Sequence, residues 1–114
     1  MKKDDSVYLG HMIETAQKAV SKVIEKTRAD FEADEDLQLA LAHLIQIIGE
    51  AARRVSDRTV EKHPDIPWSE IVGMRHKIVH DYINLDTDVV WEVVTQDLEP
   101  LIDALERIIP PEDN

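Results

Sequence analysis

The residues best suited to chemistry lie together late in the chain, in the segment Arg75-His76-Lys77-Ile78-Val79-His80-Asp81-Tyr82. An arginine side chain is always charged, and its planar fork can hold two phosphate oxygens at once. A histidine titrates near neutral pH and can act as a general acid or base. Arg75 and His80 therefore suit a metal-independent cleavage of RNA, in which a ribose 2′-hydroxyl attacks its own phosphate. Tyr82 could stack on a base or position a phosphate.

The same segment has other interpretations. An Arg or His at a helix end can simply cap carbonyl groups, and a Tyr on an apolar stripe is often half-buried packing. His76 and His80 are four residues apart, a spacing that can share a metal ion on one face of a helix. Asp81, however, points roughly 100° away from His80 on an ideal helix. Spacing indicates no further ligand, so we expect neither a metal nor a cofactor.

Helical geometry limits how Arg75 and His80 can come together. At about 100° per residue, Tyr82 lies on nearly the same stripe as Arg75, whereas His80 lies roughly 140° around the helix. One straight helix therefore does not place Arg75 and His80 side by side. They can converge if the helix end deforms, or if a second copy of the chain supplies the other half of the site.

The charge of the chain bears on this chemistry. The formal net charge is −11, which argues against a nucleic-acid binder because phosphate contacts require Lys and Arg. The balance is −3 over residues 1–49, zero over 50–82 and −8 over 83–114. The middle third is thus the least repulsive toward a polyanion, and its cations are Arg53, Arg54, Arg58, Lys62, Arg75 and Lys77. If RNA binds, we expect it in a cleft lined by residues 50–82, with the acidic termini turned away. Taken singly, Arg53, Arg54 and Arg58 are more typical of solvated positions.

Length and composition point to one domain over residues 1–114. Hydrophobic residues make up 43%, enough for a core, and the absence of cysteine excludes disulfides and thiolate metal sites. No uncharged run is long enough to span a membrane, and the first residues lack the apolar segment of a signal peptide. We therefore expect a cytoplasmic protein that does not bind membranes.

The first half of the chain contains two amphipathic stretches. Apolar residues recur at helical spacing over residues 7–24, with Ser6 as the expected N-cap, and the acidic stretch 30–36 is expected to end this helix. A second helix is predicted over about residues 37–55, where apolar side chains extend beyond one stripe. Such a helix packs on two neighbours or on a second subunit.

The second half predicts the remaining elements. A short irregular piece ends at His63, and a third helix should run from Pro67 to near Tyr82. A fourth, capped by Asp86 or Thr87, should extend to about residue 108 with a kink or break at its internal proline, Pro100. Trp68 and Trp91 are expected to anchor the core or an interface. The predicted fold is all-α: an up-and-down bundle of four main helices plus a short one.

One segment also carries a family resemblance. Residues 47–101 are similar to the HepT family of the HEPN superfamily, small helical proteins that are mostly toxins of prokaryotic toxin–antitoxin pairs. The motif is Arg, four residues, His, one residue, Tyr, here Arg75 to Tyr82. Its surroundings make the match specific: IGEAARR precedes it, IPWSEIVGMR leads into it, and VWEVV follows.

The resemblance implies a function that spacing alone does not. It implies a metal-independent endoribonuclease that acts as a homodimer on RNA rather than DNA, with Arg75 and His80 as the catalytic pair. It also implies a nucleotidyltransferase antitoxin of the MNT type, which transfers AMP from ATP to Tyr82. His76 departs from the family, where Asn commonly follows the motif arginine, so it is at most an accessory residue. The alternative hypothesis is a non-catalytic helical module that binds a nucleotidyltransferase or a nucleotide.

Overall fold

The computed structural model describes residues 3–79 and 84–109, and helices make up most of both ranges. Within these ranges the only extended pairing is one isolated antiparallel bridge between Val79 and Leu85. The predicted all-α class is therefore confirmed. None of the described helices is long and apolar enough to cross a membrane.

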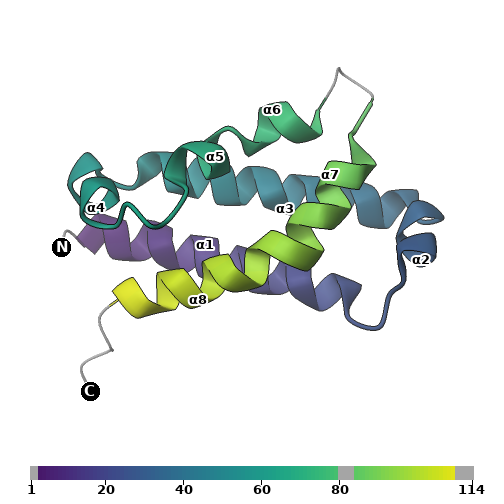
Figure 1. Ribbon diagram of the computed structural model, residues 1–114, viewed down its shortest axis with the longest axis horizontal. Helices are drawn as coiled ribbons and strands as arrows, with labels where there is room; N and C mark the ends of the chain where they lie inside the picture. The colour runs from purple at the N-terminus through teal and green to yellow at the C-terminus, as the bar shows by residue number, and fades with distance from the viewer. Residues whose placement is uncertain (1–2, 80–83, 110–114) are drawn as a thin grey trace.

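Two long helices form the base of the bundle. Helices α1 (Lys3–Val23) and α3 (Glu35–Arg54) pack along each other, and α8 (Leu98–Ile108) packs on α1 (Figure 1). The predicted second helix is confirmed to within two residues at its start and one at its end. Phe31 and Trp91 stack with their ring centroids 5.1 Å apart, and Trp68 is buried, so both tryptophans serve the core as expected. The fully buried side chains include Leu9, Met12, Leu41, Ile45, Ile78, Leu98 and Leu105.

The N-terminal helix begins and ends earlier than its sequence pattern predicts. Ser6 does not cap it, because α1 begins at Lys3. Its end lies at Val23 rather than in the acidic stretch, and Glu25 follows with a positive φ of 64°. The acidic stretch instead contains a short unpredicted helix, α2 (Arg28–Glu32), whose start is fixed by a reciprocal capping box.

A buried carboxylate explains why the first helix starts before Ser6. Asp5 is only 3% exposed, and its oxygens accept hydrogen bonds from Ser56 N (3.0 Å), Ser56 Oγ (2.7 Å) and Thr59 Oγ1 (2.6 Å). Ser56 is in turn the N-cap of α4 (Asp57–Lys62). Asp5 thus ties the start of the chain to the connection that follows α3.

The predicted third helix is two short helices rather than one. Helix α5 (Trp68–Val72) is separated from α6 (Met74–Ile78) by Gly73, and α6 ends well before residue 82. A Cβ on Gly73 would lie 3.2 Å from the Ser69 carbonyl oxygen, so the backbone is tight at this break. After Ile78 the chain turns extended and pairs with the segment that leads into the next helix.

The last helical region bends where its proline predicts. Helix α7 (Thr87–Glu92) is capped by Asp86, as expected, and continues into a π-helical turn, η1 (Val93–Asp97), before α8. Pro100 has no N–H to donate to the carbonyl four residues earlier, and the backbone widens in the turn just before it. The helical region does not break at Pro100, which lies inside α8; the irregularity that the proline predicts takes the form of this π turn upstream.

Candidate active site

Arg75, the arginine singled out by the sequence, lies on α6 with its side chain exposed. It borders a polar cavity of about 310 Å³ between α6 and the second half of α3. The lining residues are Gln46, Gly49, Glu50, Arg53, Val72, Arg75 and His76.

The α3 side of this cavity follows from helical periodicity. Gln46, Glu50 and Arg53 recur at spacings of four and three, so they form one polar stripe along the helix. Gly49, beside that stripe, lets the next layer approach, because a Cβ there would lie 3.1 Å from the backbone carbonyl of Ile71. This close contact holds α5 against α3. Helix α6, which carries Arg75, comes directly after α5 in the chain.

The cavity gathers cations around one acid. Arg53, Arg75 and His76 line it, and Glu50 is the only acid among the described lining residues. Across the described parts of the chain, neither arginine is in an ion pair. Five of the seven described lining residues come from residues 50–82, where the cleft is predicted, and two, Gln46 and Gly49, come from just before that range.

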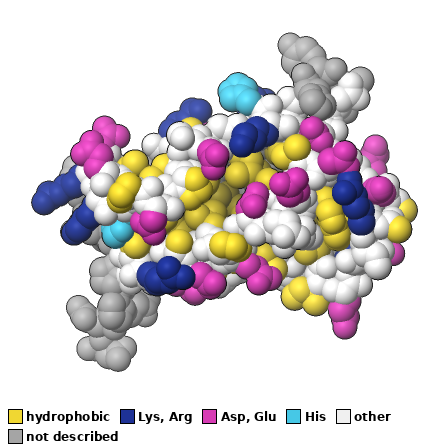
Figure 2. Space-filling model, in the orientation of Figure 1, with side chains coloured by type: hydrophobic (Ala, Val, Ile, Leu, Met, Phe, Trp, Pro, Cys, Tyr) yellow, Lys and Arg dark blue, Asp and Glu magenta, His cyan; other side chains and the backbone are white. Residues whose placement is uncertain are grey.

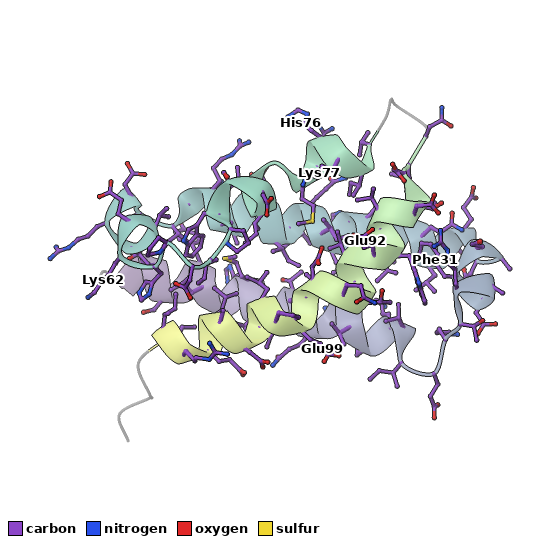
Figure 3. All side chains as sticks on the ribbon, viewed as in Figure 1. Phe31, Lys62, His76, Lys77, Glu92 and Glu99 are labelled. Carbon is purple, nitrogen blue, oxygen red and sulfur yellow. The ribbon has the colours of Figure 1, made fainter. Side chains whose placement is uncertain are left out.

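Arg53 is the residue whose role the sequence pattern understated. Its type and position are typical of a solvated helix face, yet it shares the cavity with Arg75. The available signal was its place in the polar stripe that begins at Gln46. His76, an accessory candidate, points away from the body of the protein on α6, and its neighbour Lys77 points to the other side of that helix (Figure 3).

The other predicted site residues, His80 and Tyr82, lie outside the described residues, as does Asp81. Helix α6 ends at Ile78 and Val79 is extended, so the predicted single helix does not continue through the described residues up to position 80. The possible metal pair of His76 and His80 stays a prediction, because His80 is outside the described residues. Among the side chains that the structure describes, no cluster of three or more potential ligands is found.

Comparison with known proteins identifies relatives along nearly the whole chain. A family model described as Ribonuclease HepT-like matches residues 12–108. The chain is 30% identical over 105 residues to a candidate RNase of Caldanaerobacter subterraneus subsp. tengcongensis, covering 92% of this chain and 94% of the relative. It is 33% identical over 112 residues to the "Probable ribonuclease HepT" of Thermococcus cleftensis, covering 95% and 98%.

A third relative is longer. The chain is 34% identical over 109 residues to a protein of Methanocaldococcus jannaschii named as a gamma-glutamylcyclotransferase and candidate RNase, covering 96% of this chain but 49% of the relative. No solved structure matches the chain.

Proposed function

The chain belongs to the HepT-like ribonuclease family, and from this membership we propose that it is a metal-independent endoribonuclease with Arg75 and His80 as its catalytic pair. One structural observation carries the proposal beyond membership. The motif arginine borders a polar cavity with a second arginine and a histidine, and the described residues give neither arginine a competing carboxylate partner. This is an environment suited to a phosphodiester.

The proposed reaction needs only groups that the chain can supply. His80 takes the proton from a ribose 2′-hydroxyl, and the 2′-oxygen forms a bond to the adjacent phosphorus. The bond between phosphorus and the 5′-oxygen breaks, and that oxygen takes up a proton from solvent water as it leaves, after which His80 returns its proton to solvent. The products are a 2′,3′-cyclic phosphate and a 5′-hydroxyl. Arg75 would stabilise the charge on the phosphate oxygens as the bonds rearrange.

We also propose that two copies of the chain form the working site. Leu39 and Ile47 on α3 are large apolar side chains with 54% and 36% of their surface exposed. At about 100° per residue, Leu39 continues the stripe of Gln46, Glu50 and Arg53 two turns toward the start of α3, and Ile47 lies to one side of it, so apolar surface adjoins the α3 wall of the cavity. Exposed apolar surface rimmed by polar residues is typical of a protein–protein contact. A dimer through this face would bring two polar cavities together.

The first prediction concerns the motif histidine. Purified chain, free of any partner, should cleave a single-stranded RNA, and His80→Ala should reduce the rate by about 10²–10⁴-fold because the general acid/base is lost. Gel analysis of end-labelled RNA in excess EDTA measures this and should show undiminished cleavage by the unaltered chain. His11→Ala, on an exposed face of α1, is the matched control and should keep full activity. A folded but inactive natural chain would instead favour the non-catalytic helical module.

We further propose that the chain is the toxin of a cytoplasmic pair, held inactive by an MNT-type nucleotidyltransferase antitoxin. In the proposed modification, the Tyr82 oxygen attacks the α-phosphorus of ATP, pyrophosphate leaves, and the phenolic proton is lost. The added AMP would place a bulky anion two residues from His80. Steric block and repulsion of RNA phosphate would then stop cleavage.

The second prediction follows from this regulation. Protein co-expressed with its antitoxin should carry the mass of one or more AMP groups, and Tyr82→Phe should lose them entirely because no acceptor oxygen remains. Intact-mass spectrometry reads the result. Tyr8→Phe, on α1, is the control and should be modified like the unaltered chain. Equal modification of both variants would show that Tyr82 is not the acceptor.

A further inference from the structure

A second concavity lies on the side of α6 toward which Lys77 points. It measures about 480 Å³ and runs between the α5–α6 layer and the α7–η1–α8 layer. Its apolar lining comes mainly from Ile66, Ile71, Met74, Val93, Leu98 and Leu101. We call it the apolar groove. Figure 2 shows these hydrophobic side chains as a hollow in the middle of the visible face.

The groove follows from how its two walls are supported. Helix α5 packs on α3 and helix α8 packs on α1, so the two helices stand on different parts of the base (Figure 1). The π turn contributes Val93, Gln96 and Asp97 to the wall, just before Pro100 bends the chain. π turns are frequent at functional positions because they reorient side chains that a regular helix would align.

Acidic side chains surround this apolar lining. The groove is lined by Asp65, Glu70, Glu92 and Asp97, whereas Lys77 is the only basic residue among its described lining residues. Figure 3 shows Lys77 reaching from α6 toward Glu92 on the opposite wall. Burial raises the pKa of the Asp97 carboxyl, and the charges of Glu92 and Glu70 raise it further, against the opposing effect of Lys77. The carboxylates thus repel one another across the groove.

We propose that the apolar groove binds a basic amphipathic segment of another protein, with apolar side chains on its floor and Lys or Arg side chains against its acidic rim. Charge complementarity selects this occupant. Such a rim attracts cationic side chains, slows their dissociation and repels nucleic acid. A second copy docked through the same groove is a poor occupant, because it would place two acidic rims against each other.

The test uses a synthetic helical peptide of about four turns as the probe, with Leu on one face and Lys on the other, read by fluorescence anisotropy. Glu70→Gln/Glu92→Gln/Asp97→Asn should weaken its binding about tenfold, since three rim charges are lost. The matched control, Glu99→Gln/Asp103→Asn/Glu106→Gln, removes three exposed charges of α8 that do not line the groove, and should leave affinity within about twofold. Ala104→Trp, which fills the groove without changing charge, should also weaken binding about tenfold.

Several results would overturn the proposal. Equal weakening by the two triple variants would show attraction to the overall negative charge rather than to the groove. Equal binding of a Leu/Glu peptide would remove the role of the rim. Loss of self-association in Ala104→Trp, measured by sedimentation, would show that a second copy covers the groove. Failure of the Leu/Lys peptide to bind would also contradict the proposal. None of these readouts involves RNA, so the outcome is independent of the proposed ribonuclease activity.

Discussion

Arg75→Ala is expected to slow RNA cleavage by about 10³-fold, while Arg75→Lys should recover only part of the loss. The alanine variant removes the charge that the phosphate needs in the transition state. Lysine restores the charge but not the planar fork that holds two oxygens together. Arg75 is exposed and its side chain makes no ion pair within the described structure, so neither change should alter stability by more than about 0.5 kcal/mol.

The measurement is the single-turnover rate of cleavage of a short RNA. Thermal unfolding of each variant measures its stability alongside. Arg53→Ala should have a smaller effect, about tenfold and mainly on RNA affinity, because we expect it to hold a neighbouring phosphate of the bound strand. Arg54→Ala is the control: Arg54 is exposed at the same end of α3 but does not line the polar cavity. If Arg75→Ala cleaves RNA as fast as Arg54→Ala, the polar cavity is not the catalytic site.

The regular parts of this fold were predictable because local pattern and tertiary packing agree there. The second helix was located to within two residues, since its apolar stripe is both a helical pattern and the buried face of α3. Asp86 was predicted as a cap and accepts a hydrogen bond from Val89 N at 3.2 Å. Pro100 predicted an irregularity, which appears as the π turn before it rather than as a break, because a missing N–H acts on its own helix.

The end of α6 was not predictable from local pattern. Residues 74–82 keep a helical pattern, yet the helix ends at Ile78, whose carbonyl accepts a hydrogen bond from Asp86 N at 2.7 Å. Val79 then pairs with Leu85 as an isolated bridge. Ile78 and Val79 are β-branched and tolerate an extended backbone, but only the returning chain selects it. For this reason the predicted third helix does not continue beyond Ile78.

Charge was informative once it was divided along the chain. The neutral middle third supplies five of the seven described residues that line the polar cavity, and among these residues Arg53 and Arg75 meet a single acid, Glu50. The acidic last third supplies Glu92 and Asp97 to the apolar groove instead. The net charge of −11 by itself argued against RNA binding. It could not indicate that the polar cavity and the apolar groove, on opposite sides of α6, would carry opposite charge.

Asp5 is the residue for which we expect the largest loss of stability. Asp5→Ala should lower the free energy of unfolding by about 3 kcal/mol, a large fraction of the total for a domain of this size. Its carboxylate accepts three hydrogen bonds from Ser56 and Thr59, and both Asp5 and Thr59 are buried. Removing the acceptor takes the carboxylate from Ser56 N and Thr59 Oγ1, while Ser56 Oγ keeps only a long hydrogen bond of 3.4 Å to Thr59 Oγ1. Donors left unsatisfied where water has little access cost more than the hydrogen bonds contribute.

Urea unfolding followed by circular dichroism measures the effect as a lower midpoint at an unchanged slope. Asp5→Asn should cost only about 1 kcal/mol, since the amide oxygen can still accept from Ser56 N and the two hydroxyl groups can rotate to accept from its NH₂. Asp57→Ala is the matched control. Asp57 is exposed in the first turn of α4, and its loss removes only a favourable contact with the helix dipole, less than about 1 kcal/mol. If Asp5→Ala and Asp57→Ala have the same midpoint of urea unfolding, the buried carboxylate does not stabilise the contact between α1 and α4. The early start of α1 would then need another cause, because Asp5 would no longer account for a helix that begins before Ser6.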